Sequence, residues 1–164
     1  MDRSMYRVVE NFLDPVEIQA LKEASTKCLN TAKTTYRDRF TEPHLKSLGA
    51  AADFLGDPEF EPLLVEEWSF HNAYTTLPLL HQDRDEDLFE ATGRLSFPAC
   101  SCVLYLNIKD LEGGRLAIGE DTVVPQSGML VLIAPEVWHE VEECYSGTRH
   151  SMNYNFWDVP LFNS

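Results

Sequence analysis

From about residue 64 onward, the chain consists of short apolar or alternating runs separated by Gly, Pro, Asp and Asn. These runs are Glu67–Tyr74, Leu77–Asp83, Cys100–Ile108, Gly114–Ile118, Met129–Ala134, Trp138–Glu143 and Thr148–Trp157. Short strands with turn residues between them are typical of an all-β sandwich or barrel, whereas βαβ units need helical stretches between their strands. The pattern therefore predicts a mainly β (α+β) fold with a jelly-roll core over residues 64–160.

The preceding part of the chain, residues 1–63, carries the signals of two helices. Asp14 suits the N-cap of the first helix and Pro15 its first turn, and Glu17 can close a capping box back onto Asp14. One apolar face then follows at spacings of three and four, formed by Ile18, Leu21, Ala24 and Cys28. A second helix is predicted from His44 to Leu55, where Gly56-Asp57-Pro58 would end it.

A short strand, Tyr6–Glu10, is expected ahead of the first helix. The two helices have only the β-core to pack against, so we expect them to support it from the N-terminal side. The 164 residues, 44% of them hydrophobic, match one domain of about 100–200 residues. We expect a single domain over residues 1–164, with a helical lead-in over 1–63 and the β-core over 64–160.

The charge balance limits the partners that the protein can have. Thirteen Lys and Arg against 27 Asp and Glu give a net charge of −14, which repels phosphate backbones and anionic lipid surfaces. No stretch approaches the roughly 20 apolar residues of a membrane span, and the N-terminus lacks the apolar region of a signal peptide. We expect a cytoplasmic protein with no nucleic-acid or membrane partner. Its four cysteines are too irregularly spaced for a disulfide scaffold or a zinc finger.

Two histidines and one aspartate have the pattern of a metal site. His81 and Asp83 stand two residues apart in a predicted strand, so their side chains would point the same way. His139 lies in another strand-like segment further along the chain. Two His and one carboxylate, converging from antiparallel strands, form the facial triad of non-heme Fe(II) oxygenases, which leaves open positions on the metal. The pattern predicts an iron site at these three residues.

A second polar feature follows in the last predicted strand. Alternation places one arginine on a face with mostly polar residues, namely Arg149, Ser151, Asn153, Asn155 and Trp157. A buried guanidinium is costly unless an anion pairs with it, and its fork suits a small carboxylate, with Ser151 as a further donor. Together with an iron triad, Arg149 indicates a dicarboxylate co-substrate that chelates the metal at one end.

Six segments of the chain carry a more specific resemblance. They are His81-Gln82-Asp83, Tyr105-Leu106-Asn107, Glu112-Gly113-Gly114-Arg115-Leu116, Pro125-Gln126-Ser127-Gly128, His139-Glu140-Val141 and Arg149-His150-Ser151. In order and rough spacing, residues 81–157 resemble the catalytic core of the Fe(II)/2-oxoglutarate-dependent dioxygenases, and within them the prolyl-4-hydroxylase-like branch. The strand and helix over residues 8–29 also resemble the usual lead-in of that branch.

The resemblance implies a double-stranded β-helix (jelly roll, cupin-like) fold and a set of residue roles. Fe(II) would be held by the catalytic triad His81, Asp83 and His139. 2-Oxoglutarate would be bound by Arg149, with Tyr105 donating its hydroxyl to the distal carboxylate and Ser151 contributing as in related Arg-x-Ser elements. With O2, such an enzyme hydroxylates an unactivated C–H and releases succinate and CO2. The presence of Asp83 favours hydroxylation over halogenation.

The substrate class stays open between a small molecule, an amino acid and a prolyl or other short peptide. The acidic stretch Asp85–Glu90 is expected to be a solvated loop that could form a lid over the site and would favour a cationic substrate. The roles of Tyr74 and Trp157 are left open. His44, His71 and His150 are expected to be ordinary residues, with His150 pointing outward because it alternates with Arg149.

Two alternatives from other classes remain. One is a cupin-like metal-dependent enzyme without 2-oxoglutarate. In such an enzyme Arg149 would have no carboxylate to bind. The other is a non-catalytic metal-binding domain that has kept the fold, although such a domain would be expected to lose at least one of the triad residues.

Overall fold

The computed structural model describes residues 5–25, 32–71 and 79–163. Its strands are β1 (Tyr6–Val9), β2 (Lys33–Tyr36), β3 (Leu64–His71), β4 (Cys100–Gly113), β5 (Leu116–Ile118), β6 (Asp121–Val123), β7 (Leu130–Ile133), β8 (His139–Val141) and β9 (Cys144–Trp157). Its helices are α1 (Pro15–Ser25), the 3-10 turn η1 (Arg37–Arg39), α2 (Glu42–Leu55) and α3 (Glu86–Thr92). None of the described helices is long and apolar enough to cross a bilayer.

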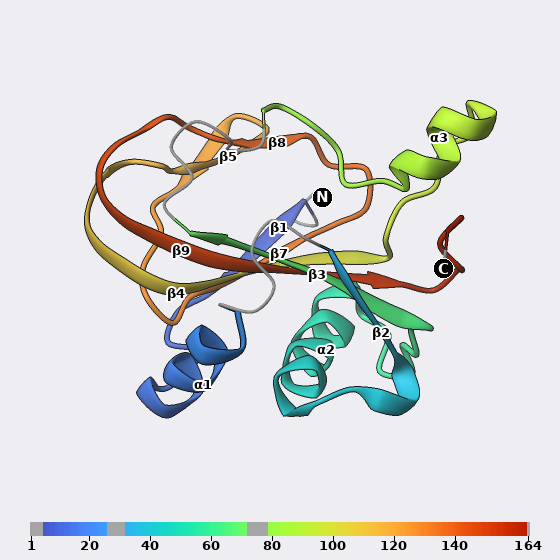
Figure 1. The fold of residues 1–164 in the computed structure, drawn as a ribbon, viewed down its shortest axis with the longest axis horizontal. Coiled ribbons are helices and arrows are strands. Elements are labelled where there is room, and N and C mark those ends of the chain that lie inside the picture. The colour runs from blue at the N-terminus through green and yellow to red at the C-terminus, as the bar shows by residue number, and fades with distance from the viewer. Residues whose placement is uncertain (1–4, 26–31, 72–78, 164) are drawn as a thin grey trace.

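The strands form two antiparallel sheets. The large sheet has the order β1-β7-β4-β9-β3-β2, and the small sheet has the order β6-β5-β8. Figure 1 shows α1 and α2 against one face of the large sheet, and β5 and β8 over its other face. Two facing sheets with helices behind one of them confirm the predicted jelly-roll fold with N-terminal supporting helices.

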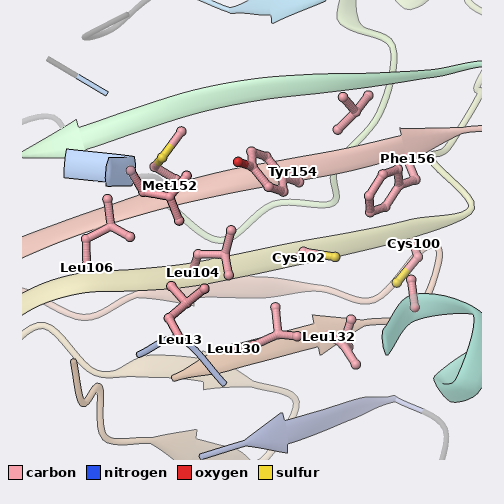
Figure 2. Close-up of a cluster of buried hydrophobic side chains, with 13 residues drawn as sticks. Leu13, Cys100, Cys102, Leu104, Leu106, Leu130, Leu132, Met152, Tyr154 and Phe156 are labelled. Atoms are coloured by element: carbon pink, nitrogen blue, oxygen red, sulfur yellow. The ribbon is translucent and has the colours of Figure 1, made fainter. Parts of the chain in front are cut away.

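Alternation along β4 divides the apolar side chains between the two faces of the large sheet. Cys102 and Leu104 point toward the helices, whereas Val103 and Tyr105 lie with the residues between the sheets. Figure 2 shows the cluster on the helix side, where β4, β7 and β9 contribute neighbouring side chains. Burying one leucine such as Leu104 stabilises the fold by about 1.5–3 kcal/mol. This packing fixes the direction in which every second residue of β9 faces the site.

The first helix begins as its sequence predicts. The backbone N–H of Glu17 donates to the Asp14 carboxylate at 2.8 Å, and the N–H of Asp14 donates to the Glu17 carboxylate at 2.9 Å. The apolar face was only partly predicted, because Leu21 is buried but Ala24 is exposed and Ser25 is buried in its place. Cys28, predicted to extend that face, lies outside the described residues.

The second helix ends at Gly56, which adopts the left-handed conformation with φ 68°. At its start, the His44 Nδ1 accepts from the backbone N–H of Thr41 at 3.1 Å, so a histidine completes this capping box. The other ring nitrogen of His44 lies 3.0 Å from the Glu67 carboxylate, in a buried pair. His44 therefore ties α2 to β3, and its role is structural.

Two segment predictions and one side-chain prediction are wrong, and two short strands were missed. Residues 86–92 form helix α3 and not a loop, because Asp85 caps the helix by accepting from the Leu88 N–H at 3.0 Å. Leu77–Asp83 is not a strand over residues 79–83, where only His81 makes an isolated β-bridge; residues 77 and 78 lie outside the described part. Strands β2 and β6 were not predicted.

The third error concerns His150, which is 3% exposed and does not point into solvent. It does alternate with Arg149, but the face that it shares is covered. Its Nε2 lies 2.8 Å from the Ser25 Oγ and 3.3 Å from the Ser69 Oγ, and its ring stacks on His71 at 4.6 Å. Burial lowers the pKa of His150 to about 4, and the nearby His71 and Lys22 add to the effect.

Candidate active site

The site is built around a backbone bridge between two distant segments. The N–H of His81 donates to the carbonyl of His139 at 3.0 Å, and the N–H of His139 donates to the carbonyl of His81 at 2.9 Å. Because the two backbones are held in register, the two rings lie side by side with their centroids 4.4 Å apart. Asp83 follows His81 after one residue and reaches both rings.

The side chains of His81, Asp83 and His139 converge on one point. The Asp83 Oδ1 lies 3.3 Å from the His81 Nε2, and its Oδ2 lies 3.4 Å from the His139 Nε2. Ligand atoms from the three residues all lie within 4.8 Å of one another. The convergence that the sequence predicts is therefore present, although the segment around Asp83 is not a strand.

Backbone carbonyls orient both rings. The His139 Nδ1 lies 2.9 Å from the carbonyl of Val137, and the His81 Nδ1 lies in hydrogen-bonding reach of the carbonyl of Leu79. Since a carbonyl can only accept, Nδ1 carries a proton in both rings, and Nε2 is the ring nitrogen that faces Asp83 and that would ligate a metal ion through its lone pair when deprotonated. Two ring lone pairs and a carboxylate that face one another fit a divalent metal ion, and the carbonyl partners are the usual support of histidine ligands.

The charges of these residues are coupled in the protein without metal. Burial opposes ionisation of Asp83, but hydrogen bonds and charge from His139 and His81 outweigh it and lower the pKa of Asp83 well below its usual range. Burial likewise opposes protonation of His81, and the hydrogen bond and charge of Asp83 outweigh it and raise the pKa of His81. These shifts hold Asp83 as the carboxylate, which is the form that ligates a metal ion.

Arg149 on β9 is a buried cation, 4% exposed. Its Nε donates to the Gly114 carbonyl at 3.0 Å, and its Nη1 donates to the Ser151 Oγ at 3.2 Å. Gly114 has φ 67°, and a Cβ at this position would lie 2.8 Å from the Cys144 Sγ and 3.2 Å from the Arg149 Cδ. The glycine is therefore needed both for its backbone conformation and for the room that the arginine occupies.

Tyr105 on β4 lies beside that guanidinium, with the Arg149 Cζ 5.3 Å from its ring centroid. Its hydroxyl is fully buried and has no hydrogen-bond partner of good geometry among the described residues. Burial raises the pKa of Tyr105, and the charge of Arg149 partly offsets the rise. A buried hydroxyl costs free energy until something accepts its hydrogen bond, so this group fits the carboxylate of a bound molecule.

A narrow cavity, here called the inner cavity, joins these groups to the triad. It is lined by Phe70, His81, Val103, Leu116, His139, Val141, Arg149, Ser151 and Asn153. The inner cavity has metal-ligating side chains at one end and a guanidinium at the other, with apolar walls between. The chemistry of this lining, two imidazoles and a guanidinium among apolar side chains, suits the two charged ends of a short dicarboxylate such as 2-oxoglutarate.

A larger cavity of about 490 Å³, here called the outer cavity, opens on the other side of the triad. It is lined by Ala32, Thr34, Glu66, Trp68, Phe70, His81, Gln82, Asp83, Arg84, Asp85, Glu86, Asp87, Asn153, Asn155, Leu161 and Asn163. His81, Phe70 and Asn153 line both cavities, so the two spaces meet at the triad. The outer cavity is large enough for a small-molecule substrate.

Glu66 lies in the wall of the outer cavity and was not predicted from the sequence. Its Oε1 accepts from the indole N–H of Trp157 at 3.1 Å. Burial raises the pKa of Glu66 to about 7; hydrogen bonds from Trp157 and Asn155 lower it, and the charges of Asp83 and Asp85 raise it. The signal that could have found it is alternation in β3, which puts Glu66, Trp68 and Phe70 on one face.

The other tryptophan, tyrosine and cysteine residues considered from the sequence line neither cavity or lie outside the described part of the chain. Trp157 is fully buried, and its indole N–H donates to Glu66, which lines the outer cavity. Trp138, in contrast, is 53% exposed. Tyr74, whose role was left open, lies outside the described residues. Cys100 and Cys102 are buried in the core as free thiols, as expected for small apolar side chains.

Comparison with known proteins places this geometry in a family. The sequence model of the 2OG-Fe(II) oxygenase superfamily matches residues 73–157, just over half of the chain. The chain belongs to this superfamily and is an oxidoreductase. Enzymes of the family use Fe(II), 2-oxoglutarate and O2, in agreement with the His-Asp-His cluster. Comparison with curated protein sequences found no significant match.

Solved structures share the fold. A prolyl-4-hydroxylase of Pseudomonas putida superposes with a TM-score of 0.65 at 20% sequence identity, covering 94% of this chain and 86% of the other. An oxidoreductase of the 2OG-Fe(II) oxygenase family from Burkholderia pseudomallei superposes with a TM-score of 0.63 at 13% identity, covering 96% and 87%. At these identities the likeness concerns the fold.

Proposed function

We propose that this protein is a 2-oxoglutarate-dependent hydroxylase that couples decarboxylation of the co-substrate to oxidation of a C–H bond. The observation that carries the proposal is the inner cavity, which has His81 and His139 at one end and Arg149 and Ser151 at the other. A cupin-like metal enzyme without an oxoacid would need neither the buried guanidinium nor the buried hydroxyl of Tyr105.

In this proposal His81, Asp83 and His139 hold Fe(II) through Nε2, a carboxylate oxygen and Nε2. The bound metal would supply O2 activation, driven by conversion of 2-oxoglutarate into succinate and CO2. Three protein ligands leave positions on an octahedral ion for the co-substrate and O2. The carbonyls of Leu79 and Val137 keep the two imidazoles in the metal-binding tautomer.

Arg149, Ser151 and Tyr105 would bind the distal carboxylate of 2-oxoglutarate. The guanidinium offers charge-assisted hydrogen bonds, and the Tyr105 hydroxyl gains the acceptor that it lacks among the described residues. The apolar walls formed by Val103, Leu116 and Val141 would exclude water from the bound co-substrate. These residues would thus orient the co-substrate and exclude water from it.

The substrate would occupy the outer cavity. A volume of about 490 Å³ suits a small molecule, an amino acid or the side chain of a short peptide. The structural neighbour named a prolyl-4-hydroxylase makes prolyl peptides one candidate. The net charge of −14 argues against a nucleic-acid substrate, and the acidic lining of the cavity argues for a cationic one.

The test is the stoichiometry of the co-substrate reaction. Anaerobically loaded Fe(II) protein is mixed with 2-oxoglutarate and O2, with and without candidate substrates, and succinate is quantified. We expect Fe(II)-dependent succinate release that a true substrate accelerates and that equals the hydroxylated product. Protein that binds Fe(II) but consumes no 2-oxoglutarate under any of these conditions would contradict the proposal and favour a metal enzyme of another kind.

A further inference from the structure

One carboxylate of the outer cavity stands apart from the proposed iron and co-substrate sites. Glu66 lies on β3 directly opposite Asn155 on β9, in the antiparallel pairing of these strands. Both side chains line the outer cavity. Asn155 stands four residues beyond Ser151 on the same face of β9, which puts it about 13 Å away from the proposed carboxylate site.

The side-chain oxygen of Asn155 indicates independently that a ligand binds here. The residue is 3% exposed, and its Oδ1 has no hydrogen-bond partner among the described residues. Its amide hydrogen-bonds to Glu66, so the carbonyl oxygen is left to accept from something else. A buried acceptor without a donor costs free energy, and a ligand that brings N–H groups would recover that cost.

The described lining of the outer cavity provides no ion-pair partner for the Glu66 carboxylate. No Lys or Arg of the described chain forms an ion pair with Glu66, and Asp83 and Asp85 both repel its charge. The basic residue in the described lining is Arg84, whose Nε lies 2.7 Å from the Glu86 carboxylate and whose guanidinium lies 4.2 Å from the centre of the Phe89 ring. Arg84 is thus held by α3.

Of the other carboxylates that line the cavity, Glu86 pairs with Arg84 and Asp87 is exposed, and the two less exposed ones have other partners. Asp83 belongs to the triad. Asp85 accepts from the Leu88 N–H through Oδ1 and from the Phe162 N–H through Oδ2 at 2.7 Å, so both its oxygens are used. Glu66, by contrast, accepts from two side chains of β9, the Trp157 indole and the Asn155 amide, and it lines the cavity together with the aromatic ring of Trp68. An aromatic wall next to a carboxylate suits an organic cation.

We propose that Glu66 and Asn155 form the specificity subsite of the enzyme and bind a positively charged amino or guanidino group of the substrate. The inference rests on the proposed function, because it places the substrate in the outer cavity beside the triad. A cation with several N–H groups can donate to the Glu66 carboxylate and to the Asn155 carbonyl at once. Asn153, two residues before Asn155 on the same face of β9, lines both cavities, so the Glu66–Asn155 pair and the triad border connected spaces.

A basic amino acid side chain has this chemistry, either free or within a peptide. The probes are therefore L-arginine and its neutral analogue L-citrulline, L-lysine and its neutral analogue L-norleucine, and a short peptide that contains each basic residue. Binding is measured by anaerobic calorimetry with Fe(II) and 2-oxoglutarate present, and turnover is measured by succinate release. Preference for the free amino acid or for the peptide identifies the source of the cationic group.

We expect at least one cationic probe to bind about ten-fold or more tightly than its neutral analogue. Glu66→Gln keeps the acceptor for the Trp157 indole but removes the charge, and it should abolish that preference. Glu90→Gln, at an exposed position of α3 that does not line the cavity, removes the same charge and should leave the preference unchanged. Circular dichroism and cooperative thermal unfolding, compared with those of the wild-type protein, show whether Glu66→Gln still folds.

Equal binding of charged and neutral analogues, no saturable binding of any cationic probe, or an unchanged preference in Glu66→Gln would each overturn the inference. The proposed function and the proposed subsite can be disproved independently. Charge-selective binding that depends on Glu66, without consumption of 2-oxoglutarate, would support the subsite and contradict the proposed function. Decarboxylation accelerated best by a neutral or anionic compound would support the function and overturn the subsite.

Discussion

His81 and His139 hydrogen-bond to each other through their backbones in both directions, at 3.0 and 2.9 Å. The bridge sets the two imidazoles side by side, with their centroids 4.4 Å apart. Asp83 then lies within 3.4 Å of both rings. The backbone pairing of two distant segments therefore positions the proposed iron ligands.

Binding of Fe(II) to the triad should stabilise the folded protein. At a free Fe(II) concentration of 100 times Kd, we expect the free energy of unfolding to rise by about 2.7 kcal/mol, because only the folded state offers the three ligands. The measurement is anaerobic denaturant unfolding with and without Fe(II). His81→Ala should lose the stabilisation, whereas His71→Ala, a histidine outside the triad, should keep it. An equal rise in both variants would place the metal elsewhere.

Arg149→Ala should weaken 2-oxoglutarate about 100-fold or more, because it removes the buried charge opposite the distal carboxylate. Fe(II) affinity should change little, since the guanidinium is not a metal ligand. Arg149→Lys keeps the charge but loses the fork, so its affinity should be intermediate. Arg115→Ala is the matched control, because Arg115 pairs with Glu142 at the surface. Calorimetry gives both affinities; unchanged co-substrate affinity in Arg149→Ala would disprove the assignment.

Tyr105→Phe should have opposite effects on two measurements. Without co-substrate the buried hydroxyl has no good partner in the described chain, so its removal should leave the free energy of unfolding unchanged or raise it by up to about 1 kcal/mol. With co-substrate, the lost hydrogen bond to the carboxylate should weaken 2-oxoglutarate about ten-fold. A large loss of stability with normal co-substrate affinity would indicate a structural role only.

The buried His150 should make the protein less stable in mild acid. Its pKa is lowered from 6.5 to about 4, so the folded protein holds a neutral ring where the unfolded chain takes up a proton. Its contribution is complete above pH 6.5 and is lost as the pH falls toward 4, by at most about 3 kcal/mol. His150→Gln should reduce this pH dependence, which unfolding at several pH values measures. An identical slope in the variant would assign the effect to other groups.

The sequence predicted the elements whose signals are local and strong. The capping box of Asp14 and Glu17 and the stop at Gly56 both appear in the structure. Strands β2 and β6 escaped prediction because Lys33–Tyr36 and Asp121–Val123 are short and largely polar or exposed, and their pairing partners alone define them. Helix α3 had readable signals, since Asp85 caps it and Gly93 ends it, but its acidic composition favoured a loop.

Burial by distant elements was harder to predict. Alternation correctly turned His150 away from Arg149, but it could not show that Ser25 of α1 covers that face. Glu66 and Glu67 look like two surface residues in sequence. In the strand they face opposite ways, so Glu67 meets the buried His44 and Glu66 enters the outer cavity. Which face of β3 borders a cavity depends on segments far along the chain.

The most direct test of the central claim is an anaerobic optical titration of metal-free protein with Fe(II) and then with 2-oxoglutarate. If the triad holds iron and the inner cavity holds the co-substrate as a chelate, a weak visible charge-transfer band should appear on the second addition and saturate at one equivalent of Fe(II). The band should be absent in Asp83→Ala. Iron binding with no band in the wild-type protein, or an unchanged band in Asp83→Ala, would contradict the account.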